Sequence, residues 1–222
     1  MKHKLEVDGV QLEFGERRIL SDIYFKCETG FISGLLGRNG EGKTCLMNIV
    51  YGSLSASSKS VRFDNVSIYE AFKRSDLLTY LPQFNFIPGF ISLKRIFSDF
   101  DISFPEFEHH FPDFRARENT KIKSFSGGQR RLIEVYIIIK SKSHFSLLDE
   151  PFSHLMPLQI DKMKEILVTE KLHKGFFITD HMYRQILDIC DSLYVLTDGK
   201  IHLTKSTEDI ERLGYINQVI SE

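Results

Sequence analysis

Short apolar stretches alternate with stretches of helical periodicity along most of this chain. Residues 5–14 and 19–25 alternate apolar and polar positions, as strands do, and are separated by a turn-like segment at 15–18. Residues 31–36 form an apolar run of the kind found in strands buried on both faces. A glycine-rich loop and a helical pattern over 43–50 follow this run, so the chain passes from strand to loop to helix.

The same alternation of strand and helix returns in the second half of the chain. Further strands are expected at 77–81, 144–148, 176–179, 193–196 and 200–204, and helices at 129–139, 157–170 and 183–190. Five serines between 53 and 60 predict an exposed loop. The phenylalanine-rich stretch 84–120 breaks the alternation and predicts an insertion of short helices and turns. Strand and helix in alternation predict an α/β core with parallel strands.

Composition narrows the class of protein further. The 222 residues include 42% hydrophobic ones, and 29 basic side chains balance 30 acidic ones to a net charge of −1. That balance predicts a folded domain and argues against a protein that coats nucleic acid, so no nucleic-acid partner is expected. The longest apolar runs have about five residues, whereas a membrane-spanning helix needs roughly 20. Three widely separated cysteines suit a reducing compartment.

A phosphate-binding loop is the first chemical motif. The run Gly37-Arg38-Asn39-Gly40-Glu41-Gly42-Lys43-Thr44 fits the pattern G-x-x-x-x-G-K-[ST] between an apolar strand and a helix. Its glycines allow backbone N–H groups to curl around phosphate, and the helix N-terminus favours an anion. The ATP-contacting residues expected here are Gly37, Asn39, Gly40, Gly42, Lys43, Thr44 and Cys45. Lys43 is expected to reach the β- and γ-phosphates and Thr44 to bind Mg²⁺.

Two carboxylates end the predicted strand at 144–148. Ligands of open α/β sheets lie beyond the carboxyl ends of the strands, where Asp149 and Glu150 follow one another. We expect Asp149 to hold Mg²⁺, directly or through water, and Glu150 to polarise the attacking water as a general base.

A third motif identifies a family. With Ser126-Gly127-Gly128-Gln129 about twenty residues before Asp149-Glu150-Pro151, the chain resembles the ABC-type ATPases, the nucleotide-binding subunits of ABC transporters. The motif order also matches, from the phosphate loop at 37–44 to His181. Ser126 and the two glycines stand where a helix begins, so free N–H groups and a hydroxyl make an anion site.

The resemblance implies roles for further residues. Gln83 corresponds to the glutamine that contacts Mg²⁺ and links the site to the membrane partner, and His181 to the histidine that contacts the γ-phosphate. Ser126, Gly127 and Gly128 correspond to a signature that completes the ATP site of a second, head-to-tail copy. Phe14 lies where the family keeps an aromatic ring on adenine, and a core position at the strand end is the alternative interpretation.

Three departures from the family pattern stand out. Met156 replaces the usual aspartate of the D-loop, Ser153 to Met156, and predicts weaker coupling between the two sites or slow turnover. Cys45 follows the loop threonine and is either a thiol of lowered pKa or a small buried filler. Residues 84–125 are short for the helical subdomain. Its apolar side chains either line a groove for the membrane subunit or form its own core, namely Phe84, Phe86, Ile87, Phe90 and Ile91.

The resemblance implies one ABC ATPase domain over residues 1–222. We expect an α/β fold: a P-loop NTPase core with a mainly parallel sheet and an N-terminal antiparallel β subdomain (1–83 and 126–222), and a small helical subdomain (84–125). The expected function is ATP hydrolysis that powers transport through separate transmembrane subunits, with ATP and Mg²⁺ as cofactors, at the cytoplasmic face of the cell membrane. The alternatives are a soluble ABC ATPase acting on ribosomes or DNA and a nucleotide-binding regulator of low turnover.

Overall fold

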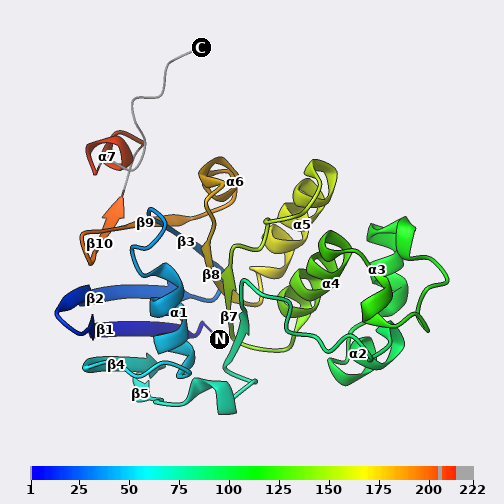
Figure 1. The fold of residues 1–222 in the computed structure, drawn as a ribbon, viewed down its shortest axis with the longest axis horizontal. Coiled ribbons are helices and arrows are strands. Elements are labelled where there is room, and N and C mark those ends of the chain that lie inside the picture. The colour runs from blue at the N-terminus through cyan, green and yellow to red at the C-terminus, as the bar shows by residue number, and fades with distance from the viewer. Residues whose placement is uncertain (1, 205–206, 214–222) are drawn as a thin grey trace.

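Two β-sheets of different character organise the chain (Figure 1). The computed structural model describes residues 2–204 and 207–213. The first sheet has four strands in the order β2-β1-β4-β5. These strands are β1 (Lys4–Phe14), β2 (Arg17–Glu28), β4 (Ser58–Phe63) and β5 (Val66–Ser67), and each pairs antiparallel with its neighbour.

The second sheet has six strands in the order β10-β9-β3-β8-β7-β6. Its members are β3 (Ile32–Leu36), β6 (Leu78–Leu81), β7 (Phe145–Asp149), β8 (Gly175–Thr179), β9 (Ser192–Thr197) and β10 (Lys200–Thr204). All pairs are parallel except β9 with β10. Every residue of β3, β7 and β8 is buried, as expected for parallel strands covered on both faces.

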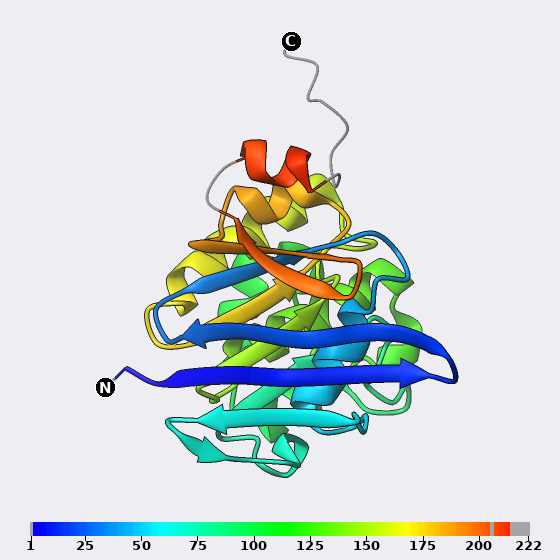
Figure 2. The ribbon, with the colours of Figure 1, turned by 90° about the vertical axis from the view of Figure 1, so that its left-hand side faces the viewer.

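Helix α1 (Lys43–Tyr51) fills the space between the two sheets. Its side chains Leu46, Met47, Ile49 and Val50 share one core with residues from strands of both sheets. Figure 2 views the molecule from the side of the antiparallel sheet, with β1 and β2 crossing in front and β4 and β5 below them. The loop that precedes α1 is therefore fixed by a helix packed from two sides.

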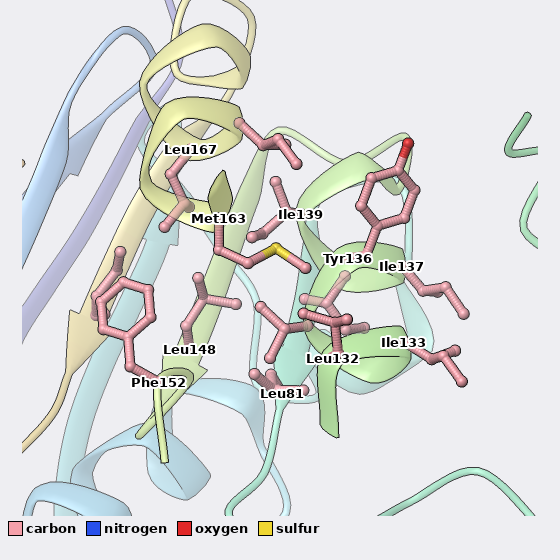
Figure 3. Close-up of a cluster of buried hydrophobic side chains, with 14 of the residues drawn as sticks. Leu81, Leu132, Ile133, Tyr136, Ile137, Ile139, Leu148, Phe152, Met163 and Leu167 are labelled. Atoms are coloured by element: carbon pink, nitrogen blue, oxygen red, sulfur yellow. The ribbon is translucent and has the colours of Figure 1, made fainter. Parts of the chain in front are cut away.

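The other face of the six-stranded sheet carries α4 (Gly127–Lys140) and α5 (Pro157–Glu170). Figure 3 shows the apolar cluster between these helices and β7. The labelled members include Leu81, Leu132, Leu148, Phe152, Met163 and Leu167, all buried. Helix α4 therefore reaches from the protein surface at its first residues into the main core.

Residues 84–125 form a compact phenylalanine-rich unit beside α4. It holds α2 (Leu93–Asp99), α3 (Phe104–His110) and 3-10 turns at Pro112–Phe114 and Ile122–Ser124. The Phe107 ring lies 4.8 Å from Phe114 and 4.9 Å from Tyr136 of α4, between ring centroids. Most of these phenylalanines therefore form the unit's own core and attach it to α4.

The remaining elements are the 3-10 turn Ala71–Lys73 and the helices α6 (Tyr183–Leu187) and α7 (Thr207–Arg212). The helix expected over 183–190 ends early, at Leu187. The prediction of a loop over 53–60 is wrong for its last three residues, because β4 begins at Ser58, which pairs with Gln11 of β1. Serines in an edge region can join a ladder through their backbone alone, which composition does not reveal. Among residues 2–204 and 207–213, no helix is long and apolar enough to cross a membrane.

Candidate nucleotide-binding site

The phosphate loop joins the carboxyl end of β3 to α1. Gly40 and Gly42 adopt positive φ angles of 85° and 102°, which L side chains rarely adopt. Gly37 has no room for a side chain, because an added Cβ would lie 2.8 Å from the carbonyl oxygen of Leu196. Glycine at these positions therefore allows the turn that aims backbone N–H groups at a bound anion.

Lys43 bends back over this loop. Its Nζ donates to the carbonyl oxygen of Gly37 at 2.6 Å and to that of Arg38 at 3.1 Å, and the side chain is buried. Burial lowers the pKa of Lys43, and the nearby carboxylates of Glu150 and Asp149 oppose that shift. The ammonium group thus holds the loop closed with contacts that a phosphate group can replace.

Asp149 and Glu150 lie at the carboxyl end of β7, as predicted. Asp149 is fully buried, and burial raises its pKa, while hydrogen bonds from Thr44 and Gln83 work in the opposite direction. The Tyr80 hydroxyl donates to Asp149 Oδ2 at 3.3 Å. The carboxylate is therefore held in a dry setting by three donors.

Glu150 adopts the left-handed backbone conformation, with φ of 51°, which few non-glycine residues adopt. Its N–H donates to the Thr179 carbonyl oxygen of β8 at 2.7 Å, and the Ser153 hydroxyl donates to Glu150 Oε2 at 3.3 Å. These contacts turn the side chain out of the strand direction and towards the phosphate loop, where Gln83 meets it.

Gln83 gathers the polar groups of the site. Its Nε2 donates to Thr44 Oγ1 at 3.0 Å, Asp149 Oδ1 at 3.3 Å and Glu150 Oε1 at 3.1 Å. The three oxygen atoms come from the loop after β3 and from the end of β7, far apart in sequence. Their convergence on one donor brings together residues predicted from three separate motifs.

Mg²⁺ prefers oxygen ligands, and in nucleotide sites it takes one or two carboxylates and completes its coordination shell with phosphates and water. Asp149, Thr44 and the Gln83 amide oxygen supply such a set after rotation of the amide. Within the described part of the chain, no group of three or more His, Cys, Asp or Glu side chains is placed to hold a metal ion by itself. The donor set therefore fits a metal that arrives with a nucleotide.

His181 lies at the open side of the site. Its Nδ1 is 3.6 Å from Glu150 Oε2 and 3.5 Å from Asp180 Oδ1, and its side chain is about half exposed. Asp180 is fully buried, and burial raises its pKa. Its carboxylate accepts from the N–H groups of Met182 at 2.9 Å and Phe152 at 3.1 Å, so it fixes the backbone on both sides of the site.

A cavity of about 430 Å³ opens beside these groups. Its walls are formed by Phe14, Ile19, Asn39, Gly40, Gly42, Lys43, Thr44, Cys45, Gln83 and Glu150. Phe14 ends β1 at the tip of the hairpin and is 54% exposed, so its interpretation as a core residue is wrong. The ring is free to cover a flat apolar ligand group.

The expectation of a lowered thiol pKa at Cys45 is also wrong. Burial raises that pKa, and the nearby Asp149 carboxylate raises it further. Burial and the Asp149 charge both favour the neutral thiol, so Cys45 lines the cavity wall as a small neutral side chain.

The signature, residues 126–129, begins α4 but does not line this cavity. Ser126 caps the helix by accepting from the Gln129 N–H at 3.3 Å, and the Gln129 side chain accepts from the Ser126 N–H at 3.1 Å. Ser126 and Gly127 are exposed and Gly128 is half-buried. The cavity wall contains none of these three residues. The phosphate loop and the signature therefore lie at separate places on the chain.

The D-loop lies beside the signature. An added Cβ at Gly128 would lie 2.6 Å from the carbonyl oxygen of His154. Met156 stands at the N-cap of α5, is 58% exposed, and contributes no side-chain hydrogen bond to that helix. The thioether therefore faces outwards at the position where the resemblance implies an aspartate.

Sequence reasoning missed the buried groups that support the site. Arg131 and Glu134 on α4, together with Tyr80 and Asp180, are mostly or fully withdrawn from solvent and lie close to Gln83, Asp149 and Glu150 in the chain or in space. The available signal was two charged residues inside the apolar face of the helix predicted over 129–139.

Comparison with known proteins agrees with this geometry. The family model for ABC transporters matches residues 20–153. The lipopolysaccharide export system ATP-binding protein LptB of Haemophilus influenzae is 28% identical, over 93% of this chain and 92% of that protein. The ribose import ATP-binding protein RbsA of Oceanobacillus iheyensis is 26% identical, over 99% of this chain and 47% of that protein. A solved structure of the ATP-binding subunit of an ABC transporter superposes with a TM-score of 0.79 at 20% identity, over 96% of this chain and 95% of that one.

The chain therefore belongs to the ABC transporter family, as the motif order implied. Within that family it is an ATP-binding subunit, an ATPase whose hydrolysis is coupled to transport. The predicted α/β fold, with its antiparallel N-terminal sheet and parallel-rich second sheet, is confirmed.

Proposed function

We propose that ATP binds in the cavity between the β1–β2 hairpin, the phosphate loop and the end of β7. Phe14 covers the adenine, and Lys43 with the loop N–H groups holds the β- and γ-phosphates. Gly37, Asn39, Gly40 and Gly42 shape the loop, and Cys45 closes the wall behind Thr44. The observation that carries the proposal is the convergence of Thr44, Asp149 and Glu150 on Gln83 beside the buried Lys43.

Thr44, Asp149 and Gln83 are the residues that would hold Mg²⁺. When bound, this ion neutralises charge on the phosphate oxygens and orients them for attack. The buried Asp149 carboxylate gains a partner that offsets its desolvation, which is the physical reason for placing an acid there.

Glu150 orients the attacking water and accepts its proton, since its carboxylate faces the cavity from the end of β7. The Ser153 hydroxyl holds one carboxylate oxygen and leaves the other facing Gln83. His181, whose Nδ1 is 3.6 Å from that carboxylate, steadies the γ-phosphate. Water attack breaks the bond between the γ-phosphorus and its bridging oxygen and releases ADP and phosphate.

A second copy completes each site. Ser126 and Gly127 are exposed and Gly128 is half-buried; the three residues stand at the start of a helix of 14 residues and lie outside the cavity of their own chain. The signature of one copy therefore faces the γ-phosphate bound to the other, in a head-to-tail pair. Residues 84–125 act as the helical subdomain of this unit, and the rest of the chain forms its core.

Transmembrane subunits are the remaining partners, and they place this chain at the cytoplasmic face of a membrane. Phe84, which directly follows Gln83, and Phe90 are 71% and 73% exposed, whereas Ile87 is buried and Phe86 and Ile91 pack against the core. Phe84 and Phe90 are therefore available to contact a membrane subunit. The other three side chains belong to the core of the subdomain. The relatives at 28% and 26% identity are named for lipopolysaccharide export and ribose import, so the proposal names transport and no cargo.

The test is the variant Glu150→Gln, which keeps the shape of the side chain and removes the base. We expect phosphate release to fall by at least about 100-fold, while ATP now holds the protein as a dimer in light scattering. Glu165→Gln, at an exposed glutamate paired with Lys162 on α5, is the matched control and should keep the wild-type rate. Wild-type protein that releases no phosphate, or a Glu150→Gln variant at full rate, would contradict the proposal.

A further inference from the structure

Helix α4 carries two buried charged residues one turn after the signature. Arg131 is 2% exposed and Glu134 is 1% exposed, although their neighbours on α4 form the apolar core seen in Figure 3. An apolar pair of similar volume would pack here without removing two charges from water. The contribution of this pair therefore lies in the hydrogen bonds that it directs.

The Arg131 guanidinium binds the backbone next to the reacting side chains. Its Nη1 donates to the Pro82 carbonyl oxygen at 2.6 Å, and its Nη2 donates to the carbonyl oxygens of Asp149 at 2.7 Å and Glu150 at 2.9 Å. One planar group thereby ties together the residue before Gln83 and both strand-end acids. A lysine has a single donor atom and cannot span these positions.

Glu134 holds the other end of the segment that contains Gln83. Its Oε1 accepts from the buried N–H of Ile87 at 3.1 Å. Residues 82–87, named here the Q-loop, are thus fastened at both ends to a single helix. Between these ends Gln83 reaches into the nucleotide site and Phe84 faces solvent.

We propose that Arg131 and Glu134 are positioning residues that make the signature, the Q-loop and Glu150 move as one unit. Ser126 caps the same helix that carries both residues, so a displacement of the signature by a second copy is passed to the backbone of Gln83 and Glu150. Hydrolysis in one site therefore responds to the closure of the other through α4. This inference rests on the proposed roles of Gln83 and Glu150 in ATP hydrolysis.

Steady-state kinetics of the full chain separate positioning from binding. Arg131→Met should lower kcat at least about tenfold and leave KM for ATP within about threefold, because Lys43 and the phosphate loop are untouched. Arg131→Lys should recover little of that loss, whereas Glu134→Gln, which keeps the acceptor, should stay within about threefold of wild type. Arg95→Met, at an exposed arginine paired with Asp99 on α2, is the matched control. Wild-type kcat in Arg131→Met, or equal rescue by Lys, overturns the inference.

Hydrogen exchange gives a readout that does not depend on hydrolysis. In nucleotide-free protein, Arg131→Met should speed amide exchange in residues 82–87 and 149–153, while residues 43–51 exchange as in wild type. Faster exchange throughout the chain would mean a general loss of stability and would overturn the inference. Were wild-type protein inactive, the proposed function would fail, and the exchange pattern would still decide whether Arg131 holds these segments.

Discussion

At the scale of single residues, Met156 is the departure with the clearest physical consequence. It caps α5 with a thioether, which accepts hydrogen bonds weakly, although its own N–H still donates to Gln159 Oε1 at 3.0 Å. The first turn of α5 therefore lacks the oxygen acceptor that most helices have at this position.

We predict that Met156→Asp raises both stability and turnover. A carboxylate at the N-cap should increase the free energy of unfolding by about 0.5–2 kcal/mol, read from urea unfolding curves. The same carboxylate restores a hydrogen-bond acceptor at the surface proposed to meet a second copy, so the phosphate-release rate should rise. Met156→Leu changes neither property and serves as the control. An unchanged rate in the aspartate variant would refute the weak-coupling interpretation.

Lys174 allows a prediction about pH. Its Nζ lies in the core and donates to the carbonyl oxygens of Ile138 at 3.2 Å and Ile139 at 3.1 Å, at the end of α4. Burial lowers the pKa of Lys174 to about 7, with Glu170 opposing and Lys140 reinforcing the shift. Above pH 7 the unfolded chain binds a proton that the folded chain has released.

The free energy of unfolding should therefore rise between about pH 7 and pH 9 through this group, by no more than about 1.4 kcal/mol per pH unit. Lys174→Met has no titrating group at this position. The free energy of unfolding of the wild type, minus that of the variant, should therefore increase over this range. Urea unfolding at several pH values measures it. Parallel pH profiles for the two proteins would show that Lys174 stays charged in its cage of carbonyl groups.

Single residues were predictable where a backbone motif fixes them. The phosphate loop and the strand-end acids follow from spacing alone, because a glycine run and a strand terminus each leave little choice of geometry. Arg131 was not predictable in its role, since its partners are carbonyl groups of Pro82, Asp149 and Glu150 that carry no side-chain identity. The pKa of Cys45 was misjudged because its main cause is burial, and the second is the charge of Asp149, more than 100 positions away; the local sequence shows neither.

At the scale of elements, the start of α4 offers a matched pair of glycines. An added Cβ at Gly127 has no heavy atom within 4 Å, whereas at Gly128 it would lie 2.6 Å from the His154 carbonyl oxygen. A methyl group at position 127 therefore disturbs only what binds to the surface, whereas a methyl group at position 128 disturbs packing within the chain.

We predict that Gly127→Ala leaves the unfolding free energy unchanged within about 0.5 kcal/mol but lowers phosphate release, because the methyl group enters the surface proposed to meet a neighbour's γ-phosphate. Gly128→Ala should lower both, since α4 must move away from the D-loop. Thermal unfolding and phosphate release measure the two effects. Full activity of Gly127→Ala would be evidence against a signature that acts in trans.

Elements were predictable in proportion to their periodicity. The helix expected over 157–170 is α5 with the same bounds, because its apolar positions recur at helical spacing after Pro157. Strand β4 was not predicted, and its first residues were assigned to a loop, because Ser58 and Ser60 pair through their backbones with Gln11 and Asp8. Helix α6 ends earlier than its pattern indicates, with Asp188 as its C-cap.

At the scale of the whole molecule, the phosphate loop and the signature occupy different surfaces of one chain. This separation makes mixing of variants informative. Lys43→Ala damages the phosphate loop and leaves the signature intact, and Gly127→Ala does the reverse. A head-to-tail pair of the two variants contains one site in which both halves are intact.

We predict that an equal mixture of these variants releases phosphate faster than the sum of the two separate rates. Met156, in place of the aspartate implied to link the two sites, favours turnover by a single intact site. Each variant alone, at the total protein concentration of the mixture, is the control. A mixture no faster than its parts would argue that each chain works alone.

The arrangement of the whole was predictable from the order of strands and helices, but the anchoring of the Q-loop to α4 was not. Alternation of elements fixes which strands run parallel, since each crossover must pass over a face of the sheet. Buried side-chain contacts between backbone segments, such as Glu134 with Ile87, depend on packing that no local pattern encodes.

The left-handed backbone of Glu150 has a consequence for how this protein tolerates change. Glycine adopts a φ of 51° without strain, so relaxing position 150 would favour the folded state by about 1 kcal/mol or more. The substitution Glu150→Gly would also remove the carboxylate that we propose as the general base. At position 150, the residue that would give the more stable fold is therefore not the residue that the proposed hydrolysis requires. The chain has a glutamate there although its backbone conformation favours glycine.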